Sequence, residues 1–426
     1  MREHEDMMLP RVVIVGAGFA GLWAARTLAA KRVSVTLIDQ NNYHLFLPLL
    51  YQVSAAEIEP EDIAYPVRTI LRRTPNVSFD LAEVKDVALR DRTVICEDHE
   101  LTYDYLILAT GSISHFFEIV GAEEHSFPLK TMDEGIALRN HILCRFEHAV
   151  HETDDEALLR RLTFVVVGGG PTGVEFAGAL AELIHGPLKK DFPSIDFGRV
   201  RIVLLEARPG VLGMLPESLQ QYGLARLRKL GVEVMLGVSV SEVNPRLVSL
   251  RNGSRIPSET VVWTAGVRGN FLAETAGFPV RSDGRIDVLP TLQTEVYPNV
   301  YAVGDLAFCR ANGASPALVA PVAISQGKWA ARNILRQVDG KSPLPLSFRD
   351  RGTMVTIGRN SGVARIGRFG FRGFPAWVLW VVVHLAKLIG FRNRILVLID
   401  WAWDYLFFER SVRLILPSNR DEGPCE

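Results

Sequence analysis

The stretch RVVIVGAGFAGLWAARTLAA, residues 11–30, decides the fold of the first part of the chain. It joins a β-branched run to three glycines, Gly16, Gly18 and Gly21, and then to an alanine-rich stretch of helical character. This order predicts a strand, a tight turn and a helix whose N-terminal N–H groups can hold a pyrophosphate. Glycines are needed because a side chain in the turn would block the phosphates. Phe19 and Ala20 complete the turn.

A second predicted strand, VSVTLID at residues 33–39, ends in Asp39, eighteen residues beyond Gly21. An acid at this place can accept hydrogen bonds from a ribose. A glycine motif alone can also be a purely structural turn. Strand, helix and acid together favour dinucleotide binding.

The same pattern recurs in LTFVVVGGGPTGVEFAGALAEL, residues 162–183, where the glycines are Gly168, Gly170 and Gly173. The strand-like VRIVLLE then ends in Glu206. The gap before this acid is long, and we interpret residues 185–199 as an inserted loop. Two such units predict two bound dinucleotides.

The second ribose acid bears on cofactor choice. Glu206 would repel and crowd a 2′-phosphate, which favours NADH over NADPH. Arg208 lies close by in the sequence and weakens that preference.

Charge and cysteine content exclude several classes of function. The 426 residues carry a formal net charge of −1, which gives no general attraction to nucleic acid. The cysteines lie far apart, so no C-x-x-C pair offers a redox disulfide or a metal site, and reduced, mostly buried thiols are expected. They are Cys96, Cys144, Cys309 and Cys425. The acidic N-terminus has no apolar run, so we expect it to stay in the cytoplasm and no secretory signal to be present.

Two shorter motifs indicate which dinucleotide is a flavin. YDYLILATGS, residues 103–112, is typical of a strand leaving the first domain, and VYAVGDLA, residues 300–307, of one returning. With these segments the sequence resembles the two-dinucleotide flavoprotein reductases. That resemblance implies FAD along the first domain, with Val84 of AEVKDV meeting adenine through its backbone. The implied FAD residues are Gly16, Gly18, Phe19, Ala20, Gly21, Asp39, Val84, Thr110, Gly111, Gly304, Asp305, Val322 and Ala323, and the implied NADH residues are Gly168, Gly170, Gly173, Glu206, Ala265 and Gly266.

The expected fold class is α/β, with two Rossmann-like domains and a C-terminal helical region that associates with a membrane. We expect the FAD domain to be split into residues 1–119 and 287–337. The NADH domain would occupy residues 120–286, and residues 338–426 would form the C-terminal region.

The complete motif set resembles one family closely. NNYHLFLPLLYQVSAAEIEPEDIAYPVR, GGGPTGVEFAG, WTAGVRGN, the G-D pair and the end IGFRNRILVLIDWAWDYLFFERSVRLI are similar to type II NADH:quinone oxidoreductases. The resemblance implies hydride transfer from NADH to FAD, electron transfer to a membrane quinone without proton pumping, and a homodimer. It also implies a role for Glu175 near the flavin and nicotinamide; the alternative is a carboxylate stabilised by its helix dipole.

The apolar stretch AWVLWVVVHLAKLIGFRNR, residues 376–394, is too short and interrupted for a spanning helix. We interpret it as a helix lying in the interface of the cytoplasmic membrane face; a dimer interface or a core helix is the alternative. Lys387 is a candidate quinone contact, although a lone lysine often snorkels. Tryptophans would lie at headgroup level and arginines would meet lipid phosphates: Trp377, Trp380, Trp401, Trp403, Arg392, Arg394, Arg410 and Arg413.

One segment departs from the family pattern. APVAISQG, residues 320–327, has Pro321 and Ser325 where glutamines are usual, and Gln326 lies one position along. The quinone could therefore be held differently, or the acceptor could differ. The alternatives are a soluble flavin reductase that uses another acceptor and, third, a regulatory protein that binds nucleotides without turnover.

Overall fold

The computed structural model describes residues 9–310, 317–348, 350, 352–407, 412–415 and 425. The chain forms two compact units. Unit 1 comprises residues 1–45, 64–113 and 267–350, and unit 2 comprises residues 46–63, 114–266 and 351–426. Arg410, expected to meet lipid, lies outside the described residues, as do residues 1–8 of the acidic N-terminus.

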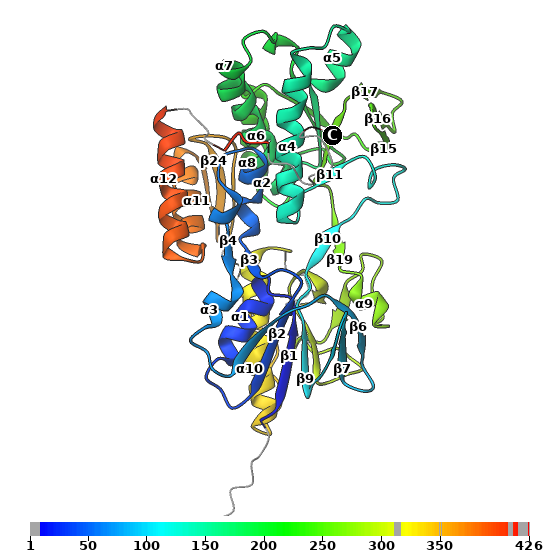
Figure 1. The fold of residues 1–426 in the computed structure, drawn as a ribbon, viewed down its shortest axis with the longest axis vertical. Coiled ribbons are helices and arrows are strands. Elements are labelled where there is room, and N and C mark those ends of the chain that lie inside the picture. The colour runs from blue at the N-terminus through cyan, green and yellow to red at the C-terminus, as the bar shows by residue number, and fades with distance from the viewer. Residues whose placement is uncertain are drawn as a thin grey trace, which may run out of the picture. The chain divides into compact units, whose positions relative to one another are not determined.

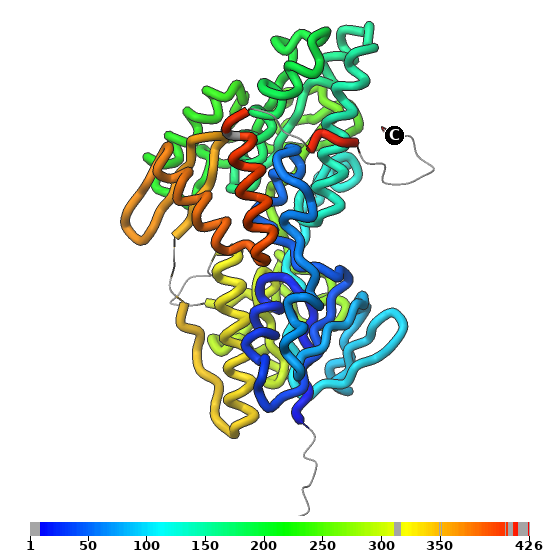
Figure 2. Tube along the Cα trace, turned by 60° about the vertical axis from the view of Figure 1, so that its left-hand side comes forward, coloured from blue at the N-terminus to red at the C-terminus, as the bar shows by residue number. Residues whose placement is uncertain are grey.

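Unit 1 is built on a five-stranded parallel sheet of order β21-β9-β1-β2-β5. Helices α1 (Phe19–Leu28) and α10 (Ala320–Val338) lie side by side against it (Figures 1 and 2). Parallel strands bring their carboxyl ends to one edge, where ligands of such folds bind. The strands are β1 (Arg11–Val15), β2 (Ser34–Asp39), β5 (Val77–Leu81), β9 (Tyr105–Leu108) and β21 (Val300–Ala302).

Smaller elements complete unit 1. An antiparallel sheet contains β6 (Val84–Ala88), β7 (Thr93–Cys96) and β8 (Glu100–Thr102). Two further pairs are β3 (Tyr43–Leu45) with β4 (Ala64–Pro66), and β20 (Ile286–Val288) with β22 (Ala307–Cys309). Helices α3 (Val67–Leu71) and α9 (Leu272–Thr275) are short, and β10 (Ser112–Ser114) pairs with β19 (Val267–Gly269).

Unit 2 repeats the parallel sheet in the order β11-β18-β12-β13-β14. Every residue of its central strand β12 (Thr163–Val167) is buried, as expected of a strand covered on both faces. The other strands are β11 (Phe127–Pro128), β13 (Arg201–Glu206), β14 (Val232–Leu236) and β18 (Thr260–Trp263), and the helices are α2 (Leu50–Ser54), α4 (Met132–Ala149), α5 (Asp155–Arg161), α6 (Pro171–Leu183) and α8 (Glu217–Lys229).

The insertion before β13 is not a simple loop. It contains a π-helical turn at Ile184–Leu188, the short helix α7 (Lys189–Asp191) and a 3₁₀ turn at Phe197–Arg199. A separate antiparallel sheet contains β15 (Val240–Asn244), β16 (Leu247–Leu250) and β17 (Arg255–Pro257).

The C-terminal part belongs to unit 2. It forms an antiparallel sheet of β23 (Thr353–Thr356), β24 (Gly362–Ile366) and β25 (Phe369–Gly373). Helices α11 (Phe374–Lys387) and α12 (Phe391–Phe407) follow and lie side by side (Figures 1 and 2). Among the described residues, no helix combines the length and apolar character needed to cross a membrane.

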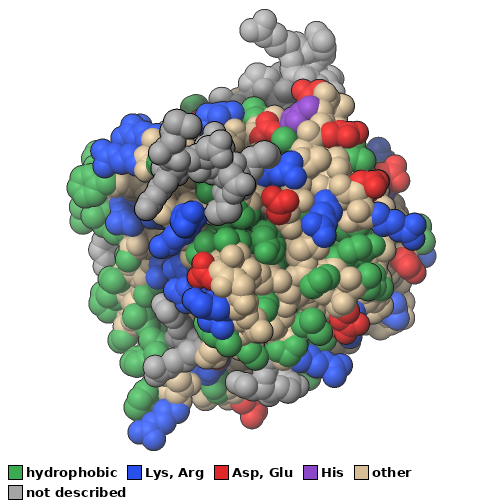
Figure 3. Space-filling model, turned by 90° about the horizontal axis from the view of Figure 1, so that it is seen from below, with side chains coloured by type: hydrophobic (Ala, Val, Ile, Leu, Met, Phe, Trp, Pro, Cys, Tyr) green, Lys and Arg blue, Asp and Glu red, His purple; other side chains and the backbone are tan. Residues whose placement is uncertain are grey.

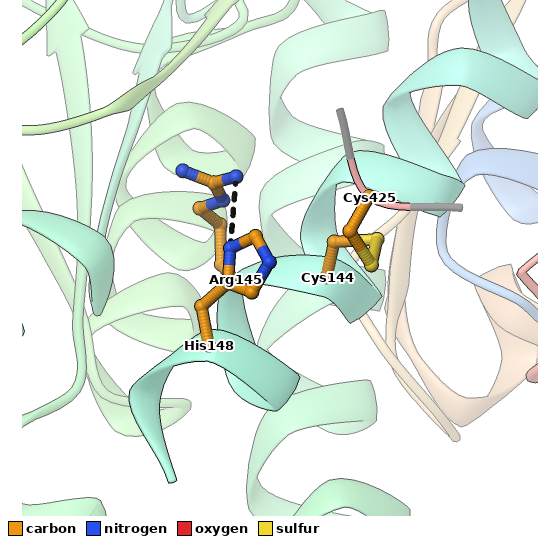
Figure 4. Close-up of a disulfide and its surroundings, with 4 residues drawn as sticks. All are labelled: Cys144, Arg145, His148 and Cys425. Carbon is orange, nitrogen blue, oxygen red and sulfur yellow. Dashed lines mark hydrogen bonds between the residues drawn. A yellow bond between two sulfur atoms is a disulfide. The ribbon is translucent and has the colours of Figure 1, made fainter. Parts of the chain in front are cut away.

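The expectation of reduced thiols is wrong for two cysteines. Cys144 of α4 and Cys425 form a disulfide, although 281 residues separate them (Figure 4). Cys96 and Cys309 are free and buried, as expected. Spacing could not predict the bridge, because only the folded chain brings the C-terminal segment to α4.

On the face shown in Figure 3, basic and acidic side chains are interspersed with hydrophobic ones.

Candidate functional site: two glycine turns and a buried carboxyl group

The turn of unit 1 requires glycine at two places for different reasons. Gly16 has φ +102°, and a Cβ there would lie 2.5 Å from the carbonyl oxygen of Ala109. A Cβ at Gly21 would lie 1.8 Å from the carbonyl oxygen of Gly16. A Cβ at Gly18 would meet no atom within 4 Å. The first two glycines therefore serve close packing, and the space beside Gly18 is open to a ligand.

Asp39 is tied to this turn. Its Oδ2 accepts a hydrogen bond from the Ala17 N–H at 2.6 Å, and its Oδ1 accepts one from the Asn41 N–H at 2.8 Å. Burial raises the pKa of Asp39, and the two backbone hydrogen bonds oppose that rise. Each carboxylate oxygen can still accept a further hydrogen bond, as ribose binding requires.

Two buried polar atoms of unit 1 are free to bond to a ligand. Among the described residues, Thr110 Oγ1 and His44 Nε2 have no hydrogen-bond partner. His44 Nδ1 lies 2.9 Å from the Ala17 carbonyl oxygen, and burial lowers the pKa of His44 to about 4, so the ring is neutral. Buried polar atoms are normally paired, so both atoms fit the edge of a bound group. The sequence reasoning missed His44.

The G-D pair is held from within unit 1. Asp305 Oδ2 accepts a hydrogen bond from Ser112 Oγ at 2.8 Å. The Gly304 N–H donates to Gln326 Oε1 at 2.7 Å, and Gln326 is only 2% exposed. The amide oxygen of Gln326, expected on the quinone side, therefore bonds to the predicted flavin-binding motif.

The other predicted residues of unit 1 are placed as follows. Pro321 is exposed in the first turn of α10, where a helix tolerates proline because that N–H has no intrahelical partner. Ser325 is half-buried. Val84 pairs with Cys96 in the β6–β7 ladder. Further predicted FAD residues are buried (Ala20, Val322, Ala323) or lie at turns (Gly111, φ +70°) and at the start of α1 (Phe19).

The turn of unit 2 has the same construction. Gly168 has φ +111°, and a Cβ there would lie 2.9 Å from the Ala265 nitrogen. A Cβ at Gly173 would lie 1.9 Å from the Gly168 carbonyl oxygen, and one at Gly170 would meet no atom within 4 Å. Glu206 Oε2 accepts a hydrogen bond from the Gly169 N–H at 2.7 Å. Open space and a helix N-terminus therefore coincide here too, which fits a pyrophosphate.

The wall beside Gly266 differs from that beside Gly111. Gly266 has φ +79°, and a Cβ there would lie 2.3 Å from the Phe117 ring. A Cβ at Gly111 would meet no atom within 4 Å. In unit 2 an aromatic ring therefore fills the space beside Gly266, whereas the space beside Gly111 in unit 1 is open.

Glu175 is a buried residue of α6. It is 9% exposed, and its Oε1 accepts hydrogen bonds from Trp380 Nε1 at 3.2 Å and from the Thr356 N–H at 3.4 Å. Burial raises the pKa of Glu175 to about 8, and these two hydrogen bonds oppose that rise. It is the fifth residue of α6, so it lies beyond the first turn of that helix.

The tryptophans expected at headgroup level divide into two groups. Trp380 is 2% exposed, and Trp401 donates its indole N–H to Gln52 Oε1 at 3.0 Å. The expectation is therefore wrong for Trp380, which is buried and donates its indole N–H to Glu175, and it stays a prediction for the half-buried Trp377 and Trp401. Trp403 is 50% exposed, and Lys387 is also exposed. The described residues contain no cluster of three or more potential metal ligands.

Comparison with known proteins first gives the class of protein. Residues 10–327 match the family model described as pyridine nucleotide-disulphide oxidoreductase. The structure of NDH2 from Plasmodium falciparum in complex with NADH aligns with a TM-score of 0.87 at 20% identity, over 93% of this chain and 98% of that one. A sulfide:quinone oxidoreductase from Aquifex aeolicus gives a TM-score of 0.71 at 18% identity, over 93% and 95%. At these identities the structures show the fold alone, and they confirm the predicted fold class.

Sequence relatives narrow the class to a family. The type II NADH:quinone oxidoreductase Ndh of Mycobacterium tuberculosis is 40% identical over 416 residues, which cover 94% of this chain and 89% of the relative. A type II NADH:quinone oxidoreductase of Staphylococcus aureus is 32% identical, over 84% of this chain and 89% of the relative. The chain belongs to the type II NADH:quinone oxidoreductases, the family indicated by its motifs.

Proposed function

We propose that this chain oxidises NADH and passes the electrons through FAD to a membrane quinone, without pumping protons. Family membership supports the donor and the acceptor. The observation that carries the proposal is the pair of glycine turns, each with open space at its second glycine and an acid bonded to its backbone. When bound, FAD accepts a hydride and stores two electrons.

Each unit has its own task in this proposal. Unit 1 holds FAD, with the turn of Gly16 on its pyrophosphate, Asp39 on its ribose, and the G-D pair and Thr110 along the rest of the cofactor. Unit 2 holds NADH, with the turn of Gly168 on the pyrophosphate and Glu206 on the ribose. The orphaned Thr110 hydroxyl and the open space at Gly18 and Gly170 support these assignments.

Glu175 carries a proton at neutral pH because its pKa is about 8. We assign it a proton-handling role in quinone reduction. If Glu175→Gln left both turnover and NADH affinity unchanged, Glu175 would be removed from the mechanism.

The protein attaches peripherally to the cytoplasmic face of a membrane in this proposal. One stripe of α12 exposes large apolar side chains at helical spacing, and α11 exposes three more. Such an exposed surface marks an interaction site, and the exposed arginines Arg392 and Arg394 suit anionic lipid. The side chains are Phe374, Val378, Val382, Phe391, Ile395, Leu398, Ile399, Trp403 and Leu406. A homodimer is proposed from the family resemblance.

The test is NADH oxidation by FAD-loaded protein with a panel of quinones, in lipid vesicles and without them. The proposal expects quinones to be the best acceptors and lipid to raise the rate. A preference for soluble acceptors over every quinone would favour the second candidate, a soluble flavin reductase. Three observations favour this second candidate: Pro321 and Ser325 replace the usual glutamines, and Gln326 forms an internal hydrogen bond.

A further inference from the structure

Unit 2 contains a small cavity, and Glu175 is part of its wall. Its volume is about 60 Å³. Sites for organic ligands measure roughly 300 to 1,000 Å³, so neither a quinone ring nor a nicotinamide fits. A water needs about 10 to 15 Å³ by this measure, so the cavity can hold on the order of four waters.

Three more carboxyl groups line the cavity, each from a different segment. They are Glu57, after α2, Glu182 of α6 and Asp404 of α12. The Arg359 N–H donates to Glu182 Oε1, and the Arg359 guanidinium lies 3.4 Å from Asp404 Oδ2. The Asp404 side chain is 23% exposed, whereas Glu175 is 9% exposed. Carboxyl groups therefore extend from the solvent side of the cavity to its buried end.

A hydroxyl group lies among these acids. Tyr51 is 3% exposed, and its oxygen accepts a hydrogen bond from Gln52 Nε2 at 3.3 Å. Burial, followed by the charges of Glu175, Glu57 and Glu182, raises the pKa of Tyr51 well above its usual range. The phenol therefore keeps its proton and can accept one hydrogen bond while donating another.

We propose that this cavity is the route by which the proton consumed in quinone reduction reaches Glu175. Glu57, Glu182 and Asp404 form its outer part, and the Tyr51 hydroxyl and enclosed waters connect them to Glu175. The proposal rests on the function proposed above and adds the positioning residues of its proton supply.

The stoichiometry of the reaction requires such a supply. NADH, one proton and a quinone give NAD⁺ and a quinol, so NADH loses two electrons and the quinone gains two. The hydride brings one hydrogen, and the second must enter as a proton from water. In each turnover the O–H bond of Glu175 breaks as its proton passes on toward the quinone, where an O–H bond of the quinol forms, and a proton arriving through the cavity re-forms the O–H bond of Glu175. The groups next to Glu175 are Thr356 from β23 and Trp380 from α11, which donate hydrogen bonds to it, and Tyr51 from α2, whose pKa responds to the charges of Glu175, Glu57 and Glu182.

The first test needs no cofactor. A pH jump on flavin-free protein is followed by time-resolved infrared spectroscopy of the Glu175 carboxyl band, which is identified by its loss in Glu175→Gln. Tyr51→Phe removes the hydroxyl and keeps the ring, and Ala179→Val fills part of the cavity. Both should slow reprotonation by roughly tenfold or more, whereas the exposed Glu61→Gln should not. Unchanged rates in both cavity variants would overturn the proposal.

The second test uses the loaded enzyme. Stopped-flow measurements separate flavin reduction by NADH from quinol formation and proton uptake, which a pH indicator follows. Tyr51→Phe should leave flavin reduction unchanged and slow quinol formation and proton uptake. A small weak acid added to this variant should restore the rate of the slowed step. Equal slowing of both steps would indicate structural damage and contradict the proposal. If the wild-type protein reduces no quinone, the proposed function fails, and the infrared experiment still decides the cavity.

Discussion

The glycine turns of unit 1 and unit 2 share one backbone plan. The first glycines have φ +102° and +111°, and a Cβ at the third glycine would lie 1.8 or 1.9 Å from the first carbonyl oxygen. In each unit an acid at the end of the next strand binds the N–H that follows the first glycine, at 2.6 and 2.7 Å. The plan recurs because both turns join a strand to a helix N-terminus within the same close packing.

Their surroundings differ seven residues after the first glycine. Unit 1 has Trp23 there, half-buried and with the Arg26 guanidinium 5.6 Å from its ring, whereas unit 2 has the buried carboxyl group of Glu175. A backbone plan can thus be used twice while the side chains of its helices carry different chemistry. Only the helix of unit 2 offers a proton at this place.

The largest effect on ligand binding should come from the third glycine. Gly173→Ala forces α6 away from the turn, because its Cβ would overlap the Gly168 carbonyl oxygen. We expect a cost of about 3 kcal/mol, an NADH dissociation constant roughly 100-fold higher by fluorescence titration, and a lower melting temperature. Gly170→Ala is the matched control, since its Cβ meets nothing within 4 Å and should weaken NADH binding without lowering the melting temperature. Equal melting temperatures for the two variants would contradict this account.

Glu175 should make stability depend on pH in a way that Trp23 cannot. Its pKa rises from 4.5 to about 8 in the fold, so its contribution is fully present below pH 4.5 and is lost as the pH rises through 8. Glu175→Gln should abolish this pH dependence of the free energy of unfolding. The change amounts to roughly 5 kcal/mol at most. Denaturant titrations at several pH values measure this, and parallel curves for the two proteins would refute it.

A smaller effect separates Gly111 of unit 1 from Gly266 of unit 2. Alanine at Gly111 or Gly266 adds about 1 kcal/mol of backbone strain, because both have positive φ. Gly266→Ala must also displace Phe117, so its total cost should be about 2 to 3 kcal/mol. Adding Phe117→Ala should recover part of the difference in thermal melting. No recovery would mean that Phe117 does not limit the space beside Gly266.

The smallest effects are expected at the acids. Asp39→Asn and Glu206→Gln each weaken one charge-assisted hydrogen bond to the turn, at a cost of about 1 kcal/mol. Glu206→Gln should raise the NADH dissociation constant roughly fivefold and reduce the preference for NADH over NADPH. Asp39→Asn should affect only the retention of FAD. Equal changes for NADH and NADPH would argue against contact of Glu206 with the ribose.

Local patterns predicted more of the fold than of the buried site. Glycine turns and the strands and helices that flank them depend on neighbours within a few residues, so the sequence predicted them. The sequence did not predict the hydrogen-bond partners of Glu175, because Trp380 lies 205 residues away and Thr356 lies 181 residues away along the chain. His44 and Tyr51 were missed for the same reason: their roles come from burial beside distant segments.

The sequence by itself determined the two strand–turn–helix units, their acids and the family, because backbone sterics and periodicity are encoded over short stretches of chain. Tertiary structure alone decided that Trp380 donates to Glu175 and Trp401 to Gln52, that Gln326 accepts from Gly304, and that Cys144 bonds to Cys425. These outcomes depend on which distant side chains share a buried space, and burial changes both hydrogen-bond requirements and pKa values.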